Sequence, residues 1–533
     1  MILLSTKVSV SWRWQKNFRH RPAIGVKNAL NALGPGHKAP LFHFTVESDL
    51  TSAYCIMSGH LRELEMSSLH TNNEAAPPLS RAIAERALSL QATDVPSDVW
   101  RYLKLCLADA LGIAFASRDY DFAHKSLASL DVLGSQGSST ILGQSSTVAM
   151  RDAALMNGLL IHGLDYDDTH LASVVHCSAS ALPATLALAE SKGLGGQALL
   201  LATLTAIEID ALLGEQAGGV FQQVGFHPTG VVGVFGAAVA AATLMGGDVD
   251  ALIRAQGIAL SLCSGSMAFL DDGSWTKRLH PGWAASAALQ AASLGVSGFE
   301  GPRDAYGGRF GFYALYAPGT KVDTAATATS LFSKWALESV AIKPYPICHF
   351  NHAPVDAALA LRAEHHLVPE QIASITILLH ERQFGVVVEP LDKKRAPQSE
   401  YDAKFSVPYA VATAIRKGFF GLSELHDAAR LDPIVLDLCQ RIDCAHDERS
   451  HYPEVFSGGV RITLKDGTVL EQFEQVNRGA EGQLLPAEQV RDKFMANCAL
   501  SITAEQAESI WECLMRLDEL EDVASLTALL RTE

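Results

Sequence analysis

The segment IHGLDYDDTHLASVVH, residues 161–176, places three aspartates, a threonine and three histidines between two apolar segments with helical spacing. Three interpretations fit this pattern: the carboxylates bind a metal ion, they form an acid–base site with the histidines, or they cap helices. Taken alone, the segment favours caps, because Asp and Thr commonly precede a helix. The choice between these interpretations depends on what the rest of the chain supplies.

Three further segments combine ionisable side chains with Gly or Pro between apolar elements: VGFHPTG at 224–230, GSWTKRLHPGWAA at 273–285, and ESVAIKPYPICHFNHAPVDAA at 338–358. Histidine suits proton transfer because its ordinary pKa, about 6.5, lies near working pH. A lysine neutralises a substrate carboxylate and positions the neighbouring carbon for deprotonation. The four segments together therefore favour a metal-free acid–base site that acts on an anionic organic acid.

The elements that must position these residues are mostly helices. The chain of 533 residues is too long for one core, and its Ala- and Leu-rich composition, 48% hydrophobic and 19% charged, is typical of packed helices. Because most of the helices lack a strong polar face, they should lie inside a multi-helix domain. Apolar spacing predicts them at 96–118 (with Ser97 as N-cap), 148–163, 180–191, 197–213, 230–245, 248–264 and 282–294.

The pattern changes near residue 340. Alternating apolar residues predict a strand at 371–380, and Asp466-Gly467 between two β-prone runs at 460–476 predicts a hairpin with a type I′ turn. Helices are expected at 352–364 and 403–417, and again after 484. The predicted fold is mainly α: a large discontinuous helical domain (77–337 and 481–533) and a smaller α+β domain (338–480) with an antiparallel sheet.

Net charge, apolar stretches and cysteine usage limit which binding partners and which cellular compartment are expected for the protein. The net charge of −16 argues against a nucleic-acid surface. The uncharged stretch 229–247 reaches the length of a membrane span, but its Gly/Ala content favours a buried helix. Nine scattered cysteines without a CxxC pair predict reduced thiols and a cytoplasmic location. Residues 1–76 form a basic extension, either an organellar (mitochondrial) transit segment or an over-extended start.

Five segments together resemble the MmgE/PrpD family, in the family's own order. They are HGLDYDDTHLASVVHCSASALPATLALAE, GFHPTG, TKRLHPGWAA, KPYPICHFNHAPVDAA and YDAKFSVPYAVATAI, and the resemblance extends from about Pro77 to about Leu530. It implies a helical domain built from both ends of the chain, a smaller α+β lid domain and a homodimer. The active site would lie between the two domains and would need no metal or organic cofactor.

The resemblance also assigns roles to individual residues. It implies that His176 is the general acid/base, with Asp165 orienting it, and that Lys277 and Lys343 bind substrate carboxylates. Asp165, His176, Lys277 and Tyr409 form the predicted catalytic set, with Tyr409 as a second proton carrier, and Thr169, His227, His280 and Lys343 form the predicted substrate-binding set.

The family includes 2-methylcitrate dehydratase, cis-aconitate decarboxylase and iminodisuccinate epimerase. The resemblance therefore implies a lyase or isomerase, such as a hydro-lyase, that transfers a proton beside a carboxylate of a small di- or tricarboxylic acid. The K-P-Y-P-x-C-H-F block differs from the dehydratase branch, which weakens the assignment to 2-methylcitrate. Two alternatives stay open: a Mg²⁺-dependent helical diphosphate enzyme with Asp165, Asp167 and Asp168 as ligands, and a non-catalytic organic-acid-binding protein of the same fold.

Overall fold

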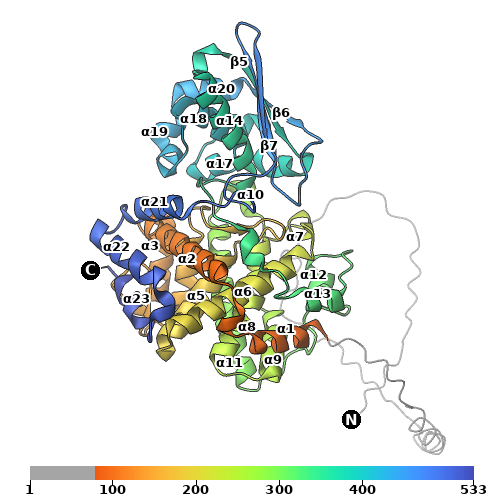
Figure 1. The fold of residues 1–533 in the computed structure, drawn as a ribbon, viewed down its shortest axis with the longest axis vertical. Helices are drawn as coiled ribbons and strands as arrows, with labels where there is room; N and C mark the ends of the chain where they lie inside the picture. The colour runs from red at the N-terminus through yellow and green to blue at the C-terminus, as the bar shows by residue number, and fades with distance from the viewer. Residues whose placement is uncertain (1–77, 533) are drawn as a thin grey trace, which may run out of the picture. The chain divides into compact units, whose positions relative to one another are not determined.

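A computed structural model of the chain describes residues 78–532. The basic extension predicted at 1–76 lies outside the described residues. Helices predominate, and a small mixed α+β unit accounts for the longer strands (Figure 1). This confirms the predicted fold class of a mainly α chain with a smaller α+β part.

Two large hydrophobic clusters divide the described chain. The first joins side chains between Leu79 and Ile342 with side chains between Leu485 and Leu530, so that α21 packs against α2 although they are far apart in sequence (Figure 1). We call these parts the helical domain. Its helices are α1 (Leu79–Ser89), α2 (Ser97–Ser117), α3 (Asp121–Val132), α4 (Met150–Ile161), α5 (Cys177–Lys192), α6 (Gly196–Glu215), α7 (Val220–Gln223), α8 (Pro228–Leu244), α9 (Val249–Ala259), α10 (Phe269–Asp272), α11 (Thr276–Val296), α12 (Phe312–Tyr316), α13 (Thr324–Ser330), α21 (Ala487–Cys498), α22 (Ala504–Met515) and α23 (Ala524–Leu529).

The second cluster belongs to the α+β domain and uses side chains between Ala341 and Ala480. A four-stranded sheet has the order β6-β5-β7-β8, and α14 packs against β7 and β8. The elements are α14 (His352–His365), β5 (Ile372–Leu379), α15 (Phe384–Val387), α16 (Leu391–Arg395), α17 (Glu400–Lys404), α18 (Val407–Lys417), α19 (Asp427–Arg430), α20 (Pro433–Gln440), β6 (Ile442–His446), β7 (Gly458–Leu464) and β8 (Val469–Glu474).

Two features of this sheet differ from the prediction. Strands β5, β7 and β8 are antiparallel, but β6 pairs with β5 in parallel, because the long helical connection from residue 380 to 441 returns the chain to the same end of the sheet. The β7–β8 hairpin forms as predicted, with a different turn. Only Gly467 has a positive φ, +90°, while the Asp466 side chain accepts a hydrogen bond from the Thr468 N–H. A type I′ turn would need positive φ at both residues.

Three predicted helix limits also change, for local reasons. Ser97 is the first helical residue and its side chain makes no cap; the N-cap position belongs to Pro96, whose carbonyl accepts from Trp100 N–H. The helix predicted at 248–264 ends at Ala259, where tighter turns follow. The one predicted at 403–417 is split into α17 and α18, since Ser406 caps α18 through Tyr409 N–H.

Two short strands pair at the end of the DYDDTH segment and connect the two domains. β3 (Thr169–His170) pairs antiparallel with β4 (Val340–Ala341), the first strand of the chain as it enters the α+β domain. Beyond β3, a four-residue loop places Leu171 and Val174 in the hydrophobic cluster of the α+β domain, and the chain then returns to start α5. The DYDDTH segment is therefore anchored on both domains.

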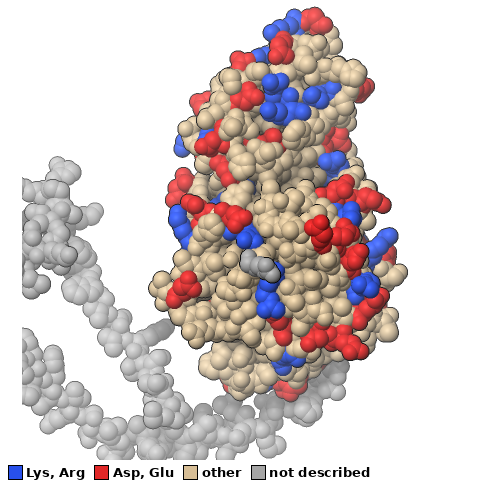
Figure 2. Space-filling model, turned by 90° about the vertical axis from the view of Figure 1, so that its left-hand side faces the viewer, with Lys and Arg blue, Asp and Glu red and all other residues tan. Residues whose placement is uncertain are grey.

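The long apolar helices are core elements. α8 contains many Gly and Ala residues, and every residue from Pro228 to Ala242 is buried. α6 is long and apolar enough to cross a membrane, but 83% of its most apolar stretch is buried inside the protein. The eight described cysteines are free. On the face in Figure 2, Lys and Arg are interspersed with Asp and Glu, and the coloured residues there form no continuous basic surface.

We predict that Gly282→Ala destabilises the helical domain. A Cβ at Gly282 in α11 would lie 2.0 Å from the Leu155 carbonyl oxygen of α4, so the two helices would have to separate. The expected loss is about 1–3 kcal/mol of unfolding free energy, measured by urea unfolding. The control is Gly385→Ala, where a Cβ would meet no atom within 4 Å. An equal effect of both substitutions would contradict this packing argument.

Candidate active site

The turn that follows α4 is held by four buried cations. Each backbone carbonyl from Gly163 to Tyr166 accepts a hydrogen bond from a different cationic side chain. In the order of the acceptors, the donors are Arg278 Nε at 2.7 Å, Lys404 Nζ at 2.7 Å, Lys343 Nζ at 2.9 Å and Lys493 Nζ at 2.9 Å. They come from α11, α17, the segment after β4, and α21, so all parts of the fold converge on this turn.

Asp165 lies at the centre of the turn, with a left-handed backbone (φ +54°) and a buried side chain. Its carboxylate lies between two ammonium groups: Lys277 Nζ is 2.9 Å from Oδ2 and Lys343 Nζ is 2.8 Å from Oδ1. Burial alone would raise the pKa of Asp165, but the two lysine charges outweigh it and hold that pKa well below its ordinary range. The three groups form a buried ionic cluster with two positive charges and one negative charge.

His176 lies beside this cluster, directly before α5. Its Nδ1 is 2.8 Å from the Asp168 carbonyl oxygen, which can only accept, so Nδ1 carries the hydrogen. Nε2 therefore holds the lone pair of the neutral ring, and it has no hydrogen-bond partner among residues 78–532. Thr169 Oγ1 lies 3.2 Å from Nδ1, and Thr229 Oγ1 accepts from the His176 backbone N–H. The arrangement fixes the ring and leaves Nε2 free as a base.

The charge state of His176 follows from its surroundings. Burial lowers the pKa of His176 to about 3, and the Asp167 carboxylate, 3.5 Å from Nδ1, opposes this only in part. Burial would raise the pKa of Asp167, but its contacts with His162 and His176 lower it strongly, so it stays ionised. The ring of His176 is thus neutral at pH 7 in the ligand-free protein.

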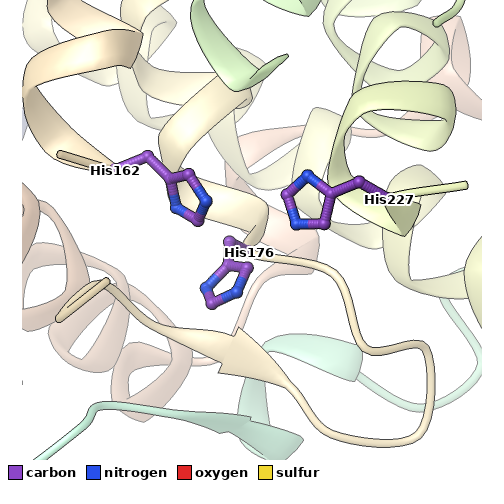
Figure 3. A group of neighbouring side chains, drawn as sticks. All are labelled: His162, His176 and His227. Atoms are coloured by element: carbon purple, nitrogen blue, oxygen red, sulfur yellow. The ribbon is translucent and has the colours of Figure 1, made fainter. Parts of the chain in front are cut away.

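Three imidazoles gather at this point (Figure 3). His162 and His227 extend toward each other, with ring centroids 5.5 Å apart, and His176 lies 4.6 Å from His162. His162 Nδ1 is 2.8 Å from Asp167 Oδ2, so this carboxylate orients two rings at once. His227 Nδ1 is 3.1 Å from Nδ1 of His280, which lies in the first turns of α11.

The α+β domain contributes a histidine to the same cavity as His176. His349 Nε2 is 2.8 Å from the amide nitrogen of Asn477, which donates, so the hydrogen of the neutral ring is on Nδ1. That Nδ1 is buried and has no partner among the described residues. Burial lowers the pKa of His349 well below its ordinary value, so the ring is neutral. It offers an N–H donor, whereas His176 offers a lone pair.

These groups line one small cavity, with a volume of about 50 Å³. Since one water molecule needs about 10–15 Å³ of such space, the cavity holds only a few waters. The polar lining of the cavity consists of Asp165, Thr169, His176, Gln222, His227, Lys277, Lys343 and His349. Four phenylalanines are part of the remaining lining, which consists of Val174, Met267, Phe269, Leu270, Cys348, Phe350, Val386, Phe405 and Phe456.

Comparison with known families matches both domains. The MmgE/PrpD N-terminal domain matches residues 81–325 and the MmgE/PrpD C-terminal domain matches residues 345–519. The chain is 30% identical to the cis-aconitate decarboxylase of Homo sapiens over 444 residues, which cover 80% of this chain and 89% of that protein.

The chain belongs to the MmgE/PrpD family.

Two other relatives show the range of enzymes to which the chain is similar. Cis-aconitate decarboxylase of Mus musculus is 29% identical over 83% of this chain and 91% of its own length. A mitochondrial 2-methylcitrate dehydratase of Yarrowia lipolytica is 24% identical over 79% of this chain and 83% of its own length. Relatives of this MmgE/PrpD chain are thus enzymes that carry out decarboxylation or dehydration.

The structure brings together six of the eight residues that the resemblance assigns to the MmgE/PrpD site. Asp165, Thr169, His176, His227, Lys277 and Lys343 line the cavity. His280 does not; it lies behind His227 and lines a separate surface pocket, so direct contact with a substrate there is not supported.

Tyr409 is also away from the cavity, and its assignment to the catalytic set is corrected. The side chain is fully buried in the α+β domain, and its hydroxyl donates to the Glu424 carbonyl at 2.5 Å. Because α18 starts only at Val407, position 409 faces the core of that domain, and Phe405 of the same block lines the cavity instead.

The capping interpretation of DYDDTH holds for one aspartate only. Asp168 accepts from Ser178 N–H in the first turn of α5, and also from the Ser178 hydroxyl. Burial raises the pKa of Asp168 to about 7. Asp165 and Asp167 pair with lysines and histidines instead. Helix capping therefore does not account for the whole cluster.

Sequence reasoning gave no acid–base or substrate-binding role to four residues of the site: His162, Asp167, His349 and Phe456. His162 and Asp167 belong to the opening segment, and their spacing of five across a non-helical turn carries no recognisable signal for a hydrogen bond. His349 lies in the K-P-Y-P-I-C-H block, so its proximity to Lys343 could have pointed to it. Phe456 is far from every motif in sequence, and only the packing of the α+β domain brings it to the wall.

Two groups in the MmgE/PrpD site have the ligand types of a metal centre: His162, His176 and His227, and Asp165, Asp167 and His176. The ligand atoms of each group lie within 4.8 Å of one another. Asp165 is, however, already neutralised by Lys277 and Lys343, and Asp167 Oδ2 is hydrogen-bonded to His162. A divalent cation would have to displace ammonium groups or lie beside them without net negative charge. The residues present fit proton transfer better than metal binding.

We predict that Asp165→Asn lowers the unfolding free energy by about 3–5 kcal/mol at pH 7, because it leaves two buried ammonium groups without their counter-ion. The pKa of Asp165 is lowered in the folded protein, so its contribution is present above the ordinary value of 3.8 and is lost as the pH falls through the lower folded value. The difference between wild type and variant should therefore shrink only below about pH 4.

Urea unfolding at pH 7, 5 and 3 measures this difference. The control is Asp121→Asn, which removes an exposed pair with Lys125 and should cost under about 1 kcal/mol at every pH. A cost for Asp165→Asn that is as small as the control, or that grows on acidification, would contradict the ionic cluster.

Proposed function

We propose that this protein is a cofactor-independent lyase that decarboxylates cis-aconitate or a closely similar unsaturated tricarboxylic acid. The observation that carries the proposal is the neutral His176, anchored through Nδ1–H with Nε2 free, beside two lysines in a small cavity. The names and coverage of the cis-aconitate decarboxylase relatives support the choice of substrate class.

The two lysines supply the recognition of the acid. Lys277 and Lys343 come from different parts of the chain, and the cluster they form with Asp165 has one uncompensated positive charge. A substrate carboxylate would neutralise this positive charge. The His349 Nδ1–H would donate a hydrogen bond to a second carboxylate of the substrate. Because the cavity of about 50 Å³ holds only a few waters, admission of the acid would require the α+β domain to move outward as a lid.

The apolar lining of the cavity suits the bond cleavage. When the carbon–carbon bond to the leaving carboxylate breaks, its electron pair stays on the carbon and neutral CO₂ departs. Aromatic side chains such as Phe405 and Phe456 disfavour the charged carboxylate relative to neutral CO₂. The remaining carboxylates, held by ammonium groups, stabilise the carbanion-like product until a proton arrives.

His176 is the proposed source of that proton. Its pKa of about 3 in the free protein reflects burial and the lysine charges. A bound tricarboxylate adds negative charge nearby, which raises the pKa of His176 and lets Nε2 take up a proton before the carbanion forms. The protonated ring then donates from Nε2 to the carbon and returns to its neutral state.

A second candidate is dehydration of a hydroxy-tricarboxylic acid, which the Yarrowia lipolytica relative supports. In this reaction His176 Nε2 would remove the proton beside a carboxylate and pass it to the departing hydroxyl, which leaves as water, while the His349 Nδ1–H would hydrogen-bond to the substrate. Both candidates use the same pair of neutral histidines. They differ in whether a carboxylate or a hydroxyl leaves.

The test is a panel of purified acids, with cis-aconitate, citrate, 2-methylcitrate and iminodisuccinate, followed by proton NMR in D₂O after dialysis against EDTA. We expect cis-aconitate to lose CO₂ and to give an unsaturated dicarboxylic acid with one deuterium on carbon. Loss of water from 2-methylcitrate would favour the second candidate. If no acid gives product or incorporates deuterium, the lyase proposal is wrong, and activity that EDTA abolishes would overturn its metal independence.

We predict that His176→Gln lowers kcat at least about 10²-fold, the usual contribution of general acid–base catalysis, with a small change in KM. Lys343→Met should instead raise KM strongly, since it removes a carboxylate contact. The matched control is His446→Gln, an exposed histidine at the end of β6, which should leave both constants unchanged. Near-normal kcat in His176→Gln would contradict the assignment of the acid.

A further inference from the structure

We propose that His280 and His227 form a proton relay that links the active-site cavity to a separate pocket on the surface of the helical domain. The inference rests on the proposed function, because a carbanion that is protonated inside a closed cavity consumes one proton per turnover. That proton has to reach the site while the lid is shut.

The two histidines face different spaces. His227 lines the active-site cavity, together with His176 and Lys277. His280 does not line that cavity; it lines an open pocket with Ser266, Thr276 and Trp283, whose side chain is 38% exposed. The Nδ1 atoms of the two rings are 3.1 Å apart, so one donates a hydrogen bond to the other. The pair thus spans the wall between the cavity and the surface pocket.

Surrounding backbone holds the pair in contact. The His227 N–H donates to the Gly265 carbonyl at 2.8 Å. Gly230 and Gly265 lie directly against His280: a Cβ at Gly230 would be 3.1 Å from the His280 Cβ, and a Cβ at Gly265 would be 3.3 Å from its Nδ1. Gly265 also has φ +150°, which side-chain-bearing residues rarely adopt. Phe269 packs beside both rings, with centroid distances of 6.2 and 6.1 Å.

Both rings are in the state that a relay needs. Burial lowers the pKa of His280 to about 4 and that of His227 still further, so both are neutral and each carries one hydrogen. In the resting tautomers His280 carries its hydrogen on Nδ1 and His227 carries its hydrogen on Nε2. This makes His280 Nδ1 the donor and His227 Nδ1 the acceptor of the bond between them.

The transfer is balanced at each step. A proton from solvent binds His280 Nε2, the Nδ1 hydrogen of His280 moves to His227 Nδ1, and the Nε2 hydrogen of His227 leaves into the cavity. One proton enters and one is delivered. The imidazole group of His176, whose ring centroid is 6.2 Å from that of His227, takes up the delivered proton directly or through a cavity water. Both relay rings end as the opposite tautomers. Once the lid opens, solvent supplies a proton to His227 Nε2, the shared hydrogen moves back to His280 Nδ1, and the Nε2 hydrogen of His280 returns to solvent.

The experiment compares His280→Gln with wild type on cis-aconitate. Glutamine keeps a hydrogen bond to His227 but does not pass a proton along its side chain. We expect kcat to fall about 10-fold or more, within the range for loss of a proton-transfer group, with KM unchanged. Added imidazole buffer should restore part of kcat in the variant and should not affect wild type. The matched control is His124→Gln, an exposed histidine on α3, for which neither effect is expected.

A merely structural role for His280 would lower kcat without rescue by imidazole, and that result would overturn the relay, as would an unchanged kcat. If His280→Gln does not fold, a proton inventory of the wild type in H₂O/D₂O mixtures decides the question. Two transferred protons give a curved plot of single-turnover rate against deuterium content, and a straight line contradicts the relay. A wild type inactive on every acid would refute the proposed function itself, which is a different outcome.

Discussion

The hydrogen bonds from buried cations to consecutive carbonyl oxygens at Gly163–Tyr166 are the constraint on which the rest of the structure depends. A buried ammonium or guanidinium group is costly unless charge and lone pairs compensate it. Here the backbone supplies the lone pairs, and the carboxylates of Asp165, Asp109 and Glu400 supply the charge. Since the donors come from separate elements, the turn, the α+β domain and the C-terminal helices have to assemble together.

The same bonds that close the fold also position the chemistry. Lys493 donates to the Tyr166 and Lys343 carbonyls while its charge pairs with Asp109, so α21 holds the backbone of Lys343 in place. Lys404 extends from the α+β domain to the Leu164 carbonyl. In the proposed function, opening of the lid would have to loosen such contacts, and a bound acid would compensate the same positive charges. Substrate binding and lid closure would then be driven by one electrostatic balance.

Much of the fold was readable from the sequence, because apolar spacing is a local property. The helices α4, α5, α6 and α8 and the β7–β8 hairpin lie where the spacing predicts them. The segment YDAKFSVPYAVATAI was misleading about Tyr409. Ser406 caps α18, and in this helix Tyr409 faces the core of the α+β domain. The parallel pairing of β6 was equally unreadable, because it depends on how a helical connection of about sixty residues returns to the sheet.

The sequence by itself determined which chemical groups are available: histidines next to helix starts, two lysines and an aspartate-rich turn. Local order along the chain encodes this much. Only the tertiary structure decided which ring nitrogen is free on His176, that His349 faces it from the other domain, and that His280 lies behind His227. The reason is physical: tautomers, shared carboxylates and burial depend on atoms far apart in sequence, whose distances are set only when both domains pack.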